Sequence, residues 1–206
     1  MTKNVSCNVN SRNVVLTMLE KTENGEKSHI VLKNTLDGYK DIDKQTRAFI
    51  TRLFQGTLER QIELDYIINI YSKTPVKKMK PVIRNILRLS VYQLKYMKSV
   101  PVSAVCNEAV KLTAKRKFSG LKGFVNGVLR NIARNIEDIK YPVNEEKKLS
   151  VNYSMPEWII KLWTQEYGIN KTKEMLTSIY SDRRTTVRVN TGRATVEEVI
   201  SILENS

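Results

Sequence analysis

The sequence predicts a mainly α-helical protein, an all-helical bundle followed by a partial α/β segment. Three observations predict this fold class. Apolar residues recur at three- and four-residue spacing through most of residues 12–136, which is the period of an amphipathic helix. Two capping boxes of the form S/T-x-x-E after residue 153 are typical of helix starts. Between these boxes, residues 185–190 alternate between polar and apolar, as a half-buried strand does.

The first half of the bundle is expected to hold three helices. They cover residues 12–20, 30–36 and 41–71, and Asp43 is the expected N-cap of the third. Gly56 falls inside that third helix, where glycine costs about 1 kcal/mol relative to alanine. We therefore interpret Gly56 as the site of a close contact between helices.

The second half of the bundle begins at a proline. Pro81 suits the first turn of a helix over residues 81–97, and another helix is expected over 102–116. A loop at 118–120 then leads to the last helix, which ends near residue 136. Residues 1–136 are accordingly predicted to form one helical domain.

The rest of the chain is organised differently. Residues 137–152 are polar and are predicted to be a linker to a third segment, 153–206. The single strand predicted at 185–190 needs partners for its backbone groups. Either it joins the helical domain or the chain stops partway through an α/β unit. We favour the second interpretation and expect the sequence to be the N-terminal part of a longer protein.

Two helices are expected on either side of that strand. Ser154 and Glu157 form the first capping box, and Thr195 and Glu198 form the second. Gly168 is the expected end of a helix, with a new one starting near Asn170. Trp158 and Trp163 fall in an amphipathic pattern, so both are expected in the core.

Length and composition exclude several classes of protein. The chain has 206 residues, of which 41% are hydrophobic and 27% charged, as in ordinary globular proteins. No stretch approaches the roughly 20 apolar residues of a membrane span, and no signal peptide is visible. Two cysteines argue against a disulfide scaffold and suit a reducing cytoplasm, where we expect the protein. A single histidine argues against a Ser-His-Asp triad and a histidine-rich metal centre.

The net charge of +14 is concentrated in one third of the chain. Residues 72–134 hold 15 lysines and arginines and one acid, Glu108, whereas the remaining residues hold 20 basic and 20 acidic side chains. Such concentration is costly through self-repulsion unless a polyanion binds there. Nucleic acid is the leading partner, although a solvated face with no partner is the alternative. An anionic membrane suits the pattern less, because the basic helices show no exposed apolar face.

The basic side chains supply the candidate contacts. A helix turns by about 100° per residue, so one set is predicted on the face opposite the apolar residues of 81–97. A second set lies at a helix end and the adjoining loop, where no acid is close in sequence. The candidates are Arg84, Arg88, Lys95, Lys115, Arg116, Lys117 and Lys122. Arg188 and Asn190 in the third segment are weaker candidates.

No residue is predicted to be catalytic or to bind a metal. Gly120, Gly123 and Gly127 match no phosphate-binding motif, and the last two are interpreted as positions of close helix packing or as the beginning of a helix. Cys106 lies on an apolar helical face and is interpreted as a small core residue. Tyr92 and Tyr96 are interpreted as packing residues in preference to base-stacking ones.

Several stretches resemble a known family. Residues 43–69, DKQTRAFITRLFQGTLERQIELDYIIN, and 80–132, which include IRNILRLSVYQL, NEAV and FVNGVLR, are similar to the NusB-type all-helical RNA-binding domain. Residues 153–168, YSMPEWIIKLWTQEYG, and 185–191, TTVRVNT, resemble the segment that joins this domain to the catalytic part of ribosomal RNA small-subunit methyltransferases B, the Sun or Fmu family.

This resemblance implies a domain that binds RNA and positions it for a downstream catalytic domain. The parent enzymes transfer a methyl group from S-adenosylmethionine to carbon 5 of a cytosine in small-subunit ribosomal RNA, using two cysteines in motifs well downstream. Neither Cys7 nor Cys106 lies in such a motif, so we expect no cofactor in this chain. The expected partners are ribosomal RNA and the protein's own downstream methyltransferase domain. The alternative is a stand-alone transcription antitermination factor of the NusB type. A further alternative is a protein–protein scaffold whose basic face binds an acidic protein.

Overall fold

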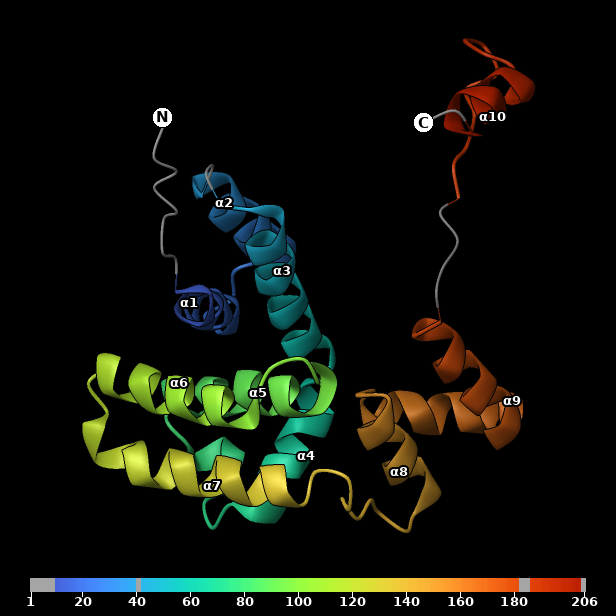
Figure 1. The fold of residues 1–206 in the computed structure, drawn as a ribbon. Coiled ribbons are helices and arrows are strands. Elements are labelled where there is room, and N and C mark those ends of the chain that lie inside the picture. The colour runs from blue at the N-terminus through green and yellow to red at the C-terminus, as the bar shows by residue number, and fades with distance from the viewer. Residues whose placement is uncertain (1–9, 40–41, 182–185, 205–206) are drawn as a thin grey trace, which may run out of the picture.

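The computed structural model describes residues 10–39, 42–181 and 186–204, and within these ranges the ordered elements are helical. Figure 1 shows the helices of the bundle stacked on one another, with the last helix set apart from the rest. The bundle is formed by α1 (Ser11–Glu23), α2 (Ser28–Gly38), α3 (Lys44–Glu59), α4 (Gln61–Tyr71), α5 (Pro81–Tyr96), α6 (Val102–Lys115) and α7 (Lys122–Arg134), with 3₁₀ turns η1 (Val76–Lys78) and η2 (Ser119–Leu121). After it come α8 (Glu145–Asn152), α9 (Glu157–Ile179) and α10 (Val196–Glu204). The mainly helical fold class is confirmed.

Helix α5 is the centre of the bundle. It packs against α1, α3, α4, α6 and α7, and every residue from Asn85 to Gln93 is buried. Two of its buried polar side chains are satisfied by the helix itself. Ser90 Oγ donates to the Ile86 carbonyl at 2.7 Å, and Gln93 Nε2 donates to the Leu89 carbonyl at 2.9 Å. A helix surrounded on so many sides has little solvent-facing surface, which bears directly on the predicted basic face.

The region predicted as one helix over 41–71 is two helices. The chain breaks at Arg60, whose φ of −100° and ψ of 15° end α3 and start α4. The predicted N-cap is confirmed, because Asp43 Oδ1 accepts from the Thr46 N–H at 2.7 Å. The interpretation of Gly56 is confirmed as well. A Cβ at this position would overlap the ring of Tyr92 on α5, so only glycine lets α3 approach α5 so closely.

The packing interpretation of Gly123 and Gly127 is wrong. Both lie on the exposed side of α7, and a Cβ at either position would have no neighbouring atom within 4 Å. The buried side of α7 is formed by Val125, Leu129 and Ile132. These glycines therefore lower the helix propensity of α7, and neither allows a close contact with another helix.

The predicted linker contains a helix. Asn144 caps α8 by accepting from the Lys147 N–H at 3.0 Å. Helices α8 and α9 share a small core of Leu149, Ile160 and Leu176, separate from the main one. Gly168, at φ 75°, bends α9 at the predicted boundary between two helices. Helix α8 also contacts α4, so the start of the region after the bundle is packed against it.

Trp158 is not a core residue, contrary to expectation. It is 66% exposed, whereas Trp163 packs against the small core. Trp158 precedes the buried Ile160 by two residues, or about 200° of helix rotation, so the two side chains leave α9 on different sides. The small core accommodates only one side of this helix.

The first predicted capping box is also wrong, and the second is confirmed. Ser154 Oγ accepts from the Glu63 N–H of α4 at 3.1 Å, and α9 begins after Pro156 instead. Before α10, the Thr195 N–H donates to Glu198 Oε2 at 2.8 Å, and Thr195 Oγ1 accepts from the Glu198 N–H at 3.2 Å.

The predicted strand is not formed by residues 186–190, which have no regular structure; Thr185 lies outside the described residues. Val187 is exposed, and the described part of the chain offers this segment no strand to pair with. Because a strand requires an edge for its N–H and C=O groups, the alternating pattern alone does not produce one. The described helices include none that combines the length and apolarity needed to cross a membrane.

Candidate nucleic-acid interface

Arg84 and Arg88 do not form the open basic face that the helical wheel predicts. Arg84 Nε donates to Glu23 Oε1 at 2.7 Å. Arg88 makes a bidentate pair with Asp65 of α4, with both nitrogen–oxygen distances at 2.7 Å, and is 8% exposed. Losing a partner from so buried a pair is strongly unfavourable. Arg88 is therefore a structural residue that holds α5 to α4.

Lys95 is also paired with a carboxylate. Its Nζ lies 2.9 Å from Glu63 Oε1 and donates to the Tyr141 hydroxyl at 2.5 Å. The Tyr141 hydroxyl donates to Glu63 Oε1 at 3.0 Å, and the Tyr96 hydroxyl donates to Glu63 Oε2. Burial opposes the charge on Lys95, but the bonds to Tyr141 and Glu63 hold its pKa above the usual value. Three donors thus satisfy one buried carboxylate, and this group links α4, α5 and the chain after α7.

Arg116 is neutralised by an acid that is distant in sequence. Its Nη2 lies 3.0 Å from Glu20 Oε2 and donates to Thr17 Oγ1 at 2.7 Å. Burial raises the pKa of Glu20, and the charge of Arg116 opposes that rise. The expectation that no acid neutralises residues 115–117 is wrong for Arg116, because α1 packs beside the end of α6 in the folded chain.

Lys115, Lys117 and Lys122 are different. All three are exposed, and none forms an ion pair with any residue that the structure describes. Lys117 has φ 66°, and the Phe118 N–H reaches back to the Thr113 carbonyl at 3.0 Å, which is the hydrogen bond of a Schellman motif. This motif ends α6 and turns the chain through η2 into α7, so the three ammonium groups lie around one connection.

The structure adds lysines that the sequence reasoning did not single out. Lys77, Lys78 and Lys80 are exposed in the connection that leads into α5, and no described acid pairs with them. Arg84 near the start of α5 and Arg116 at the end of α6 both pair with the last turns of α1, through Glu23 and Glu20. The start of α5 and the end of α6 therefore lie at the same end of the bundle.

We call this surface the basic end. It consists of Lys77, Lys78, Lys80, Lys115, Lys117 and Lys122. The signal that could have found the additional members is the run of lysines without an acid in residues 73–80. Unpaired ammonium groups gathered on two neighbouring connections form a surface that attracts a polyanion.

The weaker candidates lie elsewhere. Arg188 is exposed in the irregular segment before α10, and Asn190 Oδ1 accepts from the Gly192 N–H at 3.1 Å. Figure 1 shows that this segment is distant from α5, α6 and α7. Neither residue contributes to the basic end.

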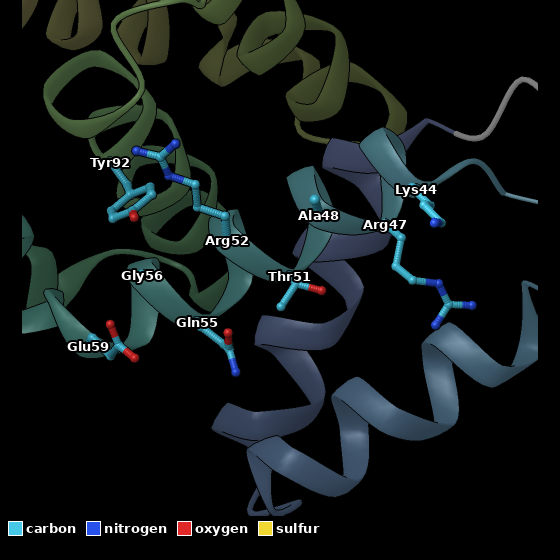
Figure 2. A pocket seen from close by; sticks show the side chains of 9 residues that line it. All are labelled: Lys44, Arg47, Ala48, Thr51, Arg52, Gln55, Gly56, Glu59 and Tyr92. Carbon is cyan, nitrogen blue, oxygen red and sulfur yellow. The ribbon is translucent and has the colours of Figure 1, made fainter. Parts of the chain in front are cut away.

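A pocket of about 550 Å³ lies along α3, with Tyr92 contributed by α5 (Figure 2). Its two arginines are engaged in hydrogen bonds within the fold. Arg47 donates to the Leu36 carbonyl at 3.2 Å and Arg52 to the Tyr96 carbonyl at 3.0 Å, so each guanidinium caps the end of a neighbouring helix. The role of these arginines is to join α3 to α2 and α5.

Cys106 is buried, and burial raises the pKa of its thiol, as expected for a core residue and not for a nucleophile. Cys7 lies outside the described residues. The described part of the chain contains no cluster of three or more His, Cys, Asp or Glu side chains suited to a metal ion.

Comparison with known proteins agrees with this architecture. Residues 9–134 match the NusB family, and residues 155–206 match the Methyltr_RsmF/B-like ferredoxin-like domain. The chain is 33% identical over 194 residues to the probable ribosomal RNA small subunit methyltransferase B of Bacillus subtilis (strain 168). That alignment covers 92% of this chain and 42% of the relative, so the chain spans less than half the length of that protein.

Two solved structures share the fold. PH0851 has a TM-score of 0.68 at 20% identity, over 98% of this chain and 46% of that one, which supports the fold alone. NusB in a complex of the antitermination factors NusB and NusE with double-stranded RNA has a TM-score of 0.55 at 26% identity. That match covers 60% of this chain and 93% of the other.

Proposed function

Since the chain belongs to the NusB family, we propose that its helical bundle binds small-subunit ribosomal RNA through the basic end. In this proposal residues 1–136 are the RNA-binding domain of an S-adenosylmethionine-dependent methyltransferase that acts on carbon 5 of a cytosine. The observation that carries the proposal is the set of exposed lysines that have no acidic partner among the described residues, on a fold shared with a NusB protein found in complex with RNA.

The segment that follows the bundle supports a methyltransferase over a stand-alone antitermination factor. Residues 155–206 match a domain of the RsmF/B-like methyltransferases, and α8 packs against both α4 of the bundle and α9. Holding RNA at a fixed position relative to a catalytic domain raises the effective concentration of the target base. The bundle thus positions the RNA and takes no part in the chemical step. We expect the protein to act in the cytoplasm.

The residues described do not fit S-adenosylmethionine. Gly120, Gly123 and Gly127 lie on or just before α7 with no strand leading into them, so they form no loop for a nucleotide-like ligand. We place the cofactor site in the methyltransferase domain of the parent protein. Adding S-adenosylmethionine to this chain should leave its Tm unchanged, and a rise of several degrees would contradict this placement.

The proposal is tested by RNA binding at several salt concentrations. The variant Lys115→Gln/Lys117→Gln/Lys122→Gln removes three exposed charges without breaking an ion pair of the fold. We expect it to bind a small-subunit ribosomal RNA fragment more weakly and to lower the log–log salt slope by about 2 to 3.

The control is Lys147→Gln/Lys148→Gln/Lys161→Gln, which removes three exposed lysines from α8 and α9. If RNA binding weakens equally in both variants, net charge alone determines the affinity, and the basic end is not the binding surface. Charge reversal of Arg88 is unsuitable as a test, because it would place a carboxylate beside Asp65 and unfold the bundle.

A further inference from the structure

A second cavity lies at the end of α6 and α7 opposite the basic end. It has a volume of about 520 Å³ and lies between the first turns of α6 and the last turns of α7. Its lining residues are Val102, Ser103, Cys106, Arg130, Ala133 and Arg134. Because α6 and α7 run antiparallel, this cavity and Lys115 to Lys122 occupy the two ends of the same pair of helices.

The two arginines of this cavity lack the partners that other arginines of the bundle have. Arg130 and Arg134 are exposed, and neither pairs with a carboxylate anywhere in the described ranges. Arg130 Nε only donates to the amide oxygen of Asn126 at 3.1 Å. The nearest acid in sequence, Glu137, lies 4.0 Å from Lys98 instead. Two planar guanidinium groups on successive turns of α7 form a site suited to phosphate.

The floor of the cavity is apolar. Val102 is 51% exposed, and the buried Cys106 lies beside it in the lining. Burial keeps the Cys106 thiol neutral by raising its pKa. The first turn of α6 has no side-chain cap, so its backbone N–H groups remain available to an acceptor. A ligand that combines a flat apolar part with an anionic group matches this lining.

We propose that this cavity is a nucleotide pit, a second contact point for a single strand of the RNA that the basic end holds. The proposal rests on the proposed function and adds the kind of RNA and the residues that receive it. Arg134 contacts a phosphate, and a base lies over Val102 against the guanidinium plane of Arg130. Unstacked bases are commonly held in this way by apolar side chains and arginine planes.

Continuity with the basic end favours RNA over an acidic peptide as the occupant. Ser103, Asn107, Lys111 and Lys115 are exposed at four-residue intervals along α6 and so form one row. Within this row Lys111 pairs with Glu108 at 2.8 Å, and Lys115 has no acidic partner among the described residues. From Ser103 to Lys115 this row spans about 18 Å, at the helical rise of about 1.5 Å per residue. A few nucleotides of extended strand cover that length, so one RNA reaches both sites.

Binding of a 5′-labelled oligouridine of about 12 nucleotides to the full chain tests the pit; this length is several times the span between the sites. The variant Arg130→Gln/Arg134→Gln should weaken binding about tenfold and lower the salt slope by about 0.7, the single-strand value for the one phosphate that Arg134 contacts. Val102→Ser removes the apolar surface under the base and changes no charge. It should weaken binding of the single strand severalfold and leave a blunt RNA duplex unaffected, because paired bases cannot enter the cavity. Lys147→Gln/Lys148→Gln is the matched control.

The outcomes separate the pit from the proposed function. If Lys115→Gln/Lys117→Gln/Lys122→Gln weakens oligouridine binding while the arginine variant and Val102→Ser bind as the parent chain does, the pit is overturned and the basic end remains the RNA-binding surface. If the parent chain shows no salt-dependent RNA binding, the proposed function itself is contradicted, whatever the variants do. A 4-thiouridine strand should crosslink to the peptide that contains Val102 and Cys106. Crosslinks confined to residues 115–122, or a polyglutamate peptide that binds the pit more tightly than RNA does, would overturn the proposal.

Discussion

The side chain of Glu63 shows how one buried carboxylate connects three parts of the molecule. It is 3% exposed and accepts from Lys95, Tyr96 and Tyr141. Burial raises the pKa of both tyrosine hydroxyls, and their bonds to Glu63 contribute in the same direction. Lys95 retains its proton more strongly than a free lysine does. All three donors therefore bind protons more tightly in the folded chain than in the unfolded one.

This arrangement predicts loss of stability at alkaline pH. Because the folded pKa values of these donors are raised, their contribution is complete below the unfolded values of about 10 and is lost as pH rises above them. Urea unfolding at about pH 8 and about pH 10.5 should show the decline. It should be smaller in Tyr96→Phe/Tyr141→Phe, and an equal decline in both proteins would contradict the assignment.

At the scale of the element, two glycines in similar helical settings have opposite roles. Gly56 on α3 is covered by the ring of Tyr92, whereas Gly127 on α7 faces open space. Both patterns look alike in sequence, because periodicity places a glycine on a helix without showing what packs over it. The difference is decided by which helices become neighbours.

The pair makes a matched stability test. Gly56→Ala should destabilise the fold by about 1 to 3 kcal/mol, since the added methyl group overlaps Tyr92. Gly127→Ala should stabilise it by about 0.5 to 1 kcal/mol, since alanine is the better helix former and nothing obstructs it. Urea midpoints of the two variants measure both effects. Changes of the same sign would show that α3 and α5 are further apart than described.

Over the whole molecule, Arg60 joins the bundle to the segment that follows it. Its Nη1 donates to the Asn152 carbonyl at 2.9 Å, and its guanidinium lies 3.8 Å from the ring centroid of Tyr180. The Tyr180 hydroxyl in turn donates to the Tyr153 carbonyl at 2.7 Å. One side chain at the break between α3 and α4 thus contacts the end of α8 and the end of α9.

Removing this side chain should loosen the second unit and leave the first intact. In Arg60→Ala we expect faster amide hydrogen exchange in α8 and α9, with protection in α5 unchanged, because opening is local when few contacts hold a segment. Arg52→Ala on α3 is the control, because the Arg52 guanidinium donates to the Tyr96 carbonyl and not to α8 or α9. If α5 and α9 lose protection together, the chain unfolds as a single unit and Arg60 has no special role.

The distribution of charge shows most clearly what needs the tertiary structure. Residues 72–134 contain one acid, and from the sequence their arginines look unpaired. In the fold, Glu20, Glu23, Glu63 and Asp65 arrive from α1 and α4 and pair with Arg84, Arg88, Lys95 and Arg116. Lys115, Lys117 and Lys122 remain exposed because no acidic helix packs over their connection.

The sequence by itself determined the helical class, the caps at Asp43 and Thr195 and the concentration of basic residues in one third of the chain. These properties depend on residues near one another in the chain, where the helical period and hydrogen-bonding preferences act. The tertiary structure alone decided which charges are neutralised, that Trp158 faces solvent, and that Arg130 and Arg134 border a cavity. Those outcomes depend on which helices become neighbours, and packing brings together side chains separated by tens of residues.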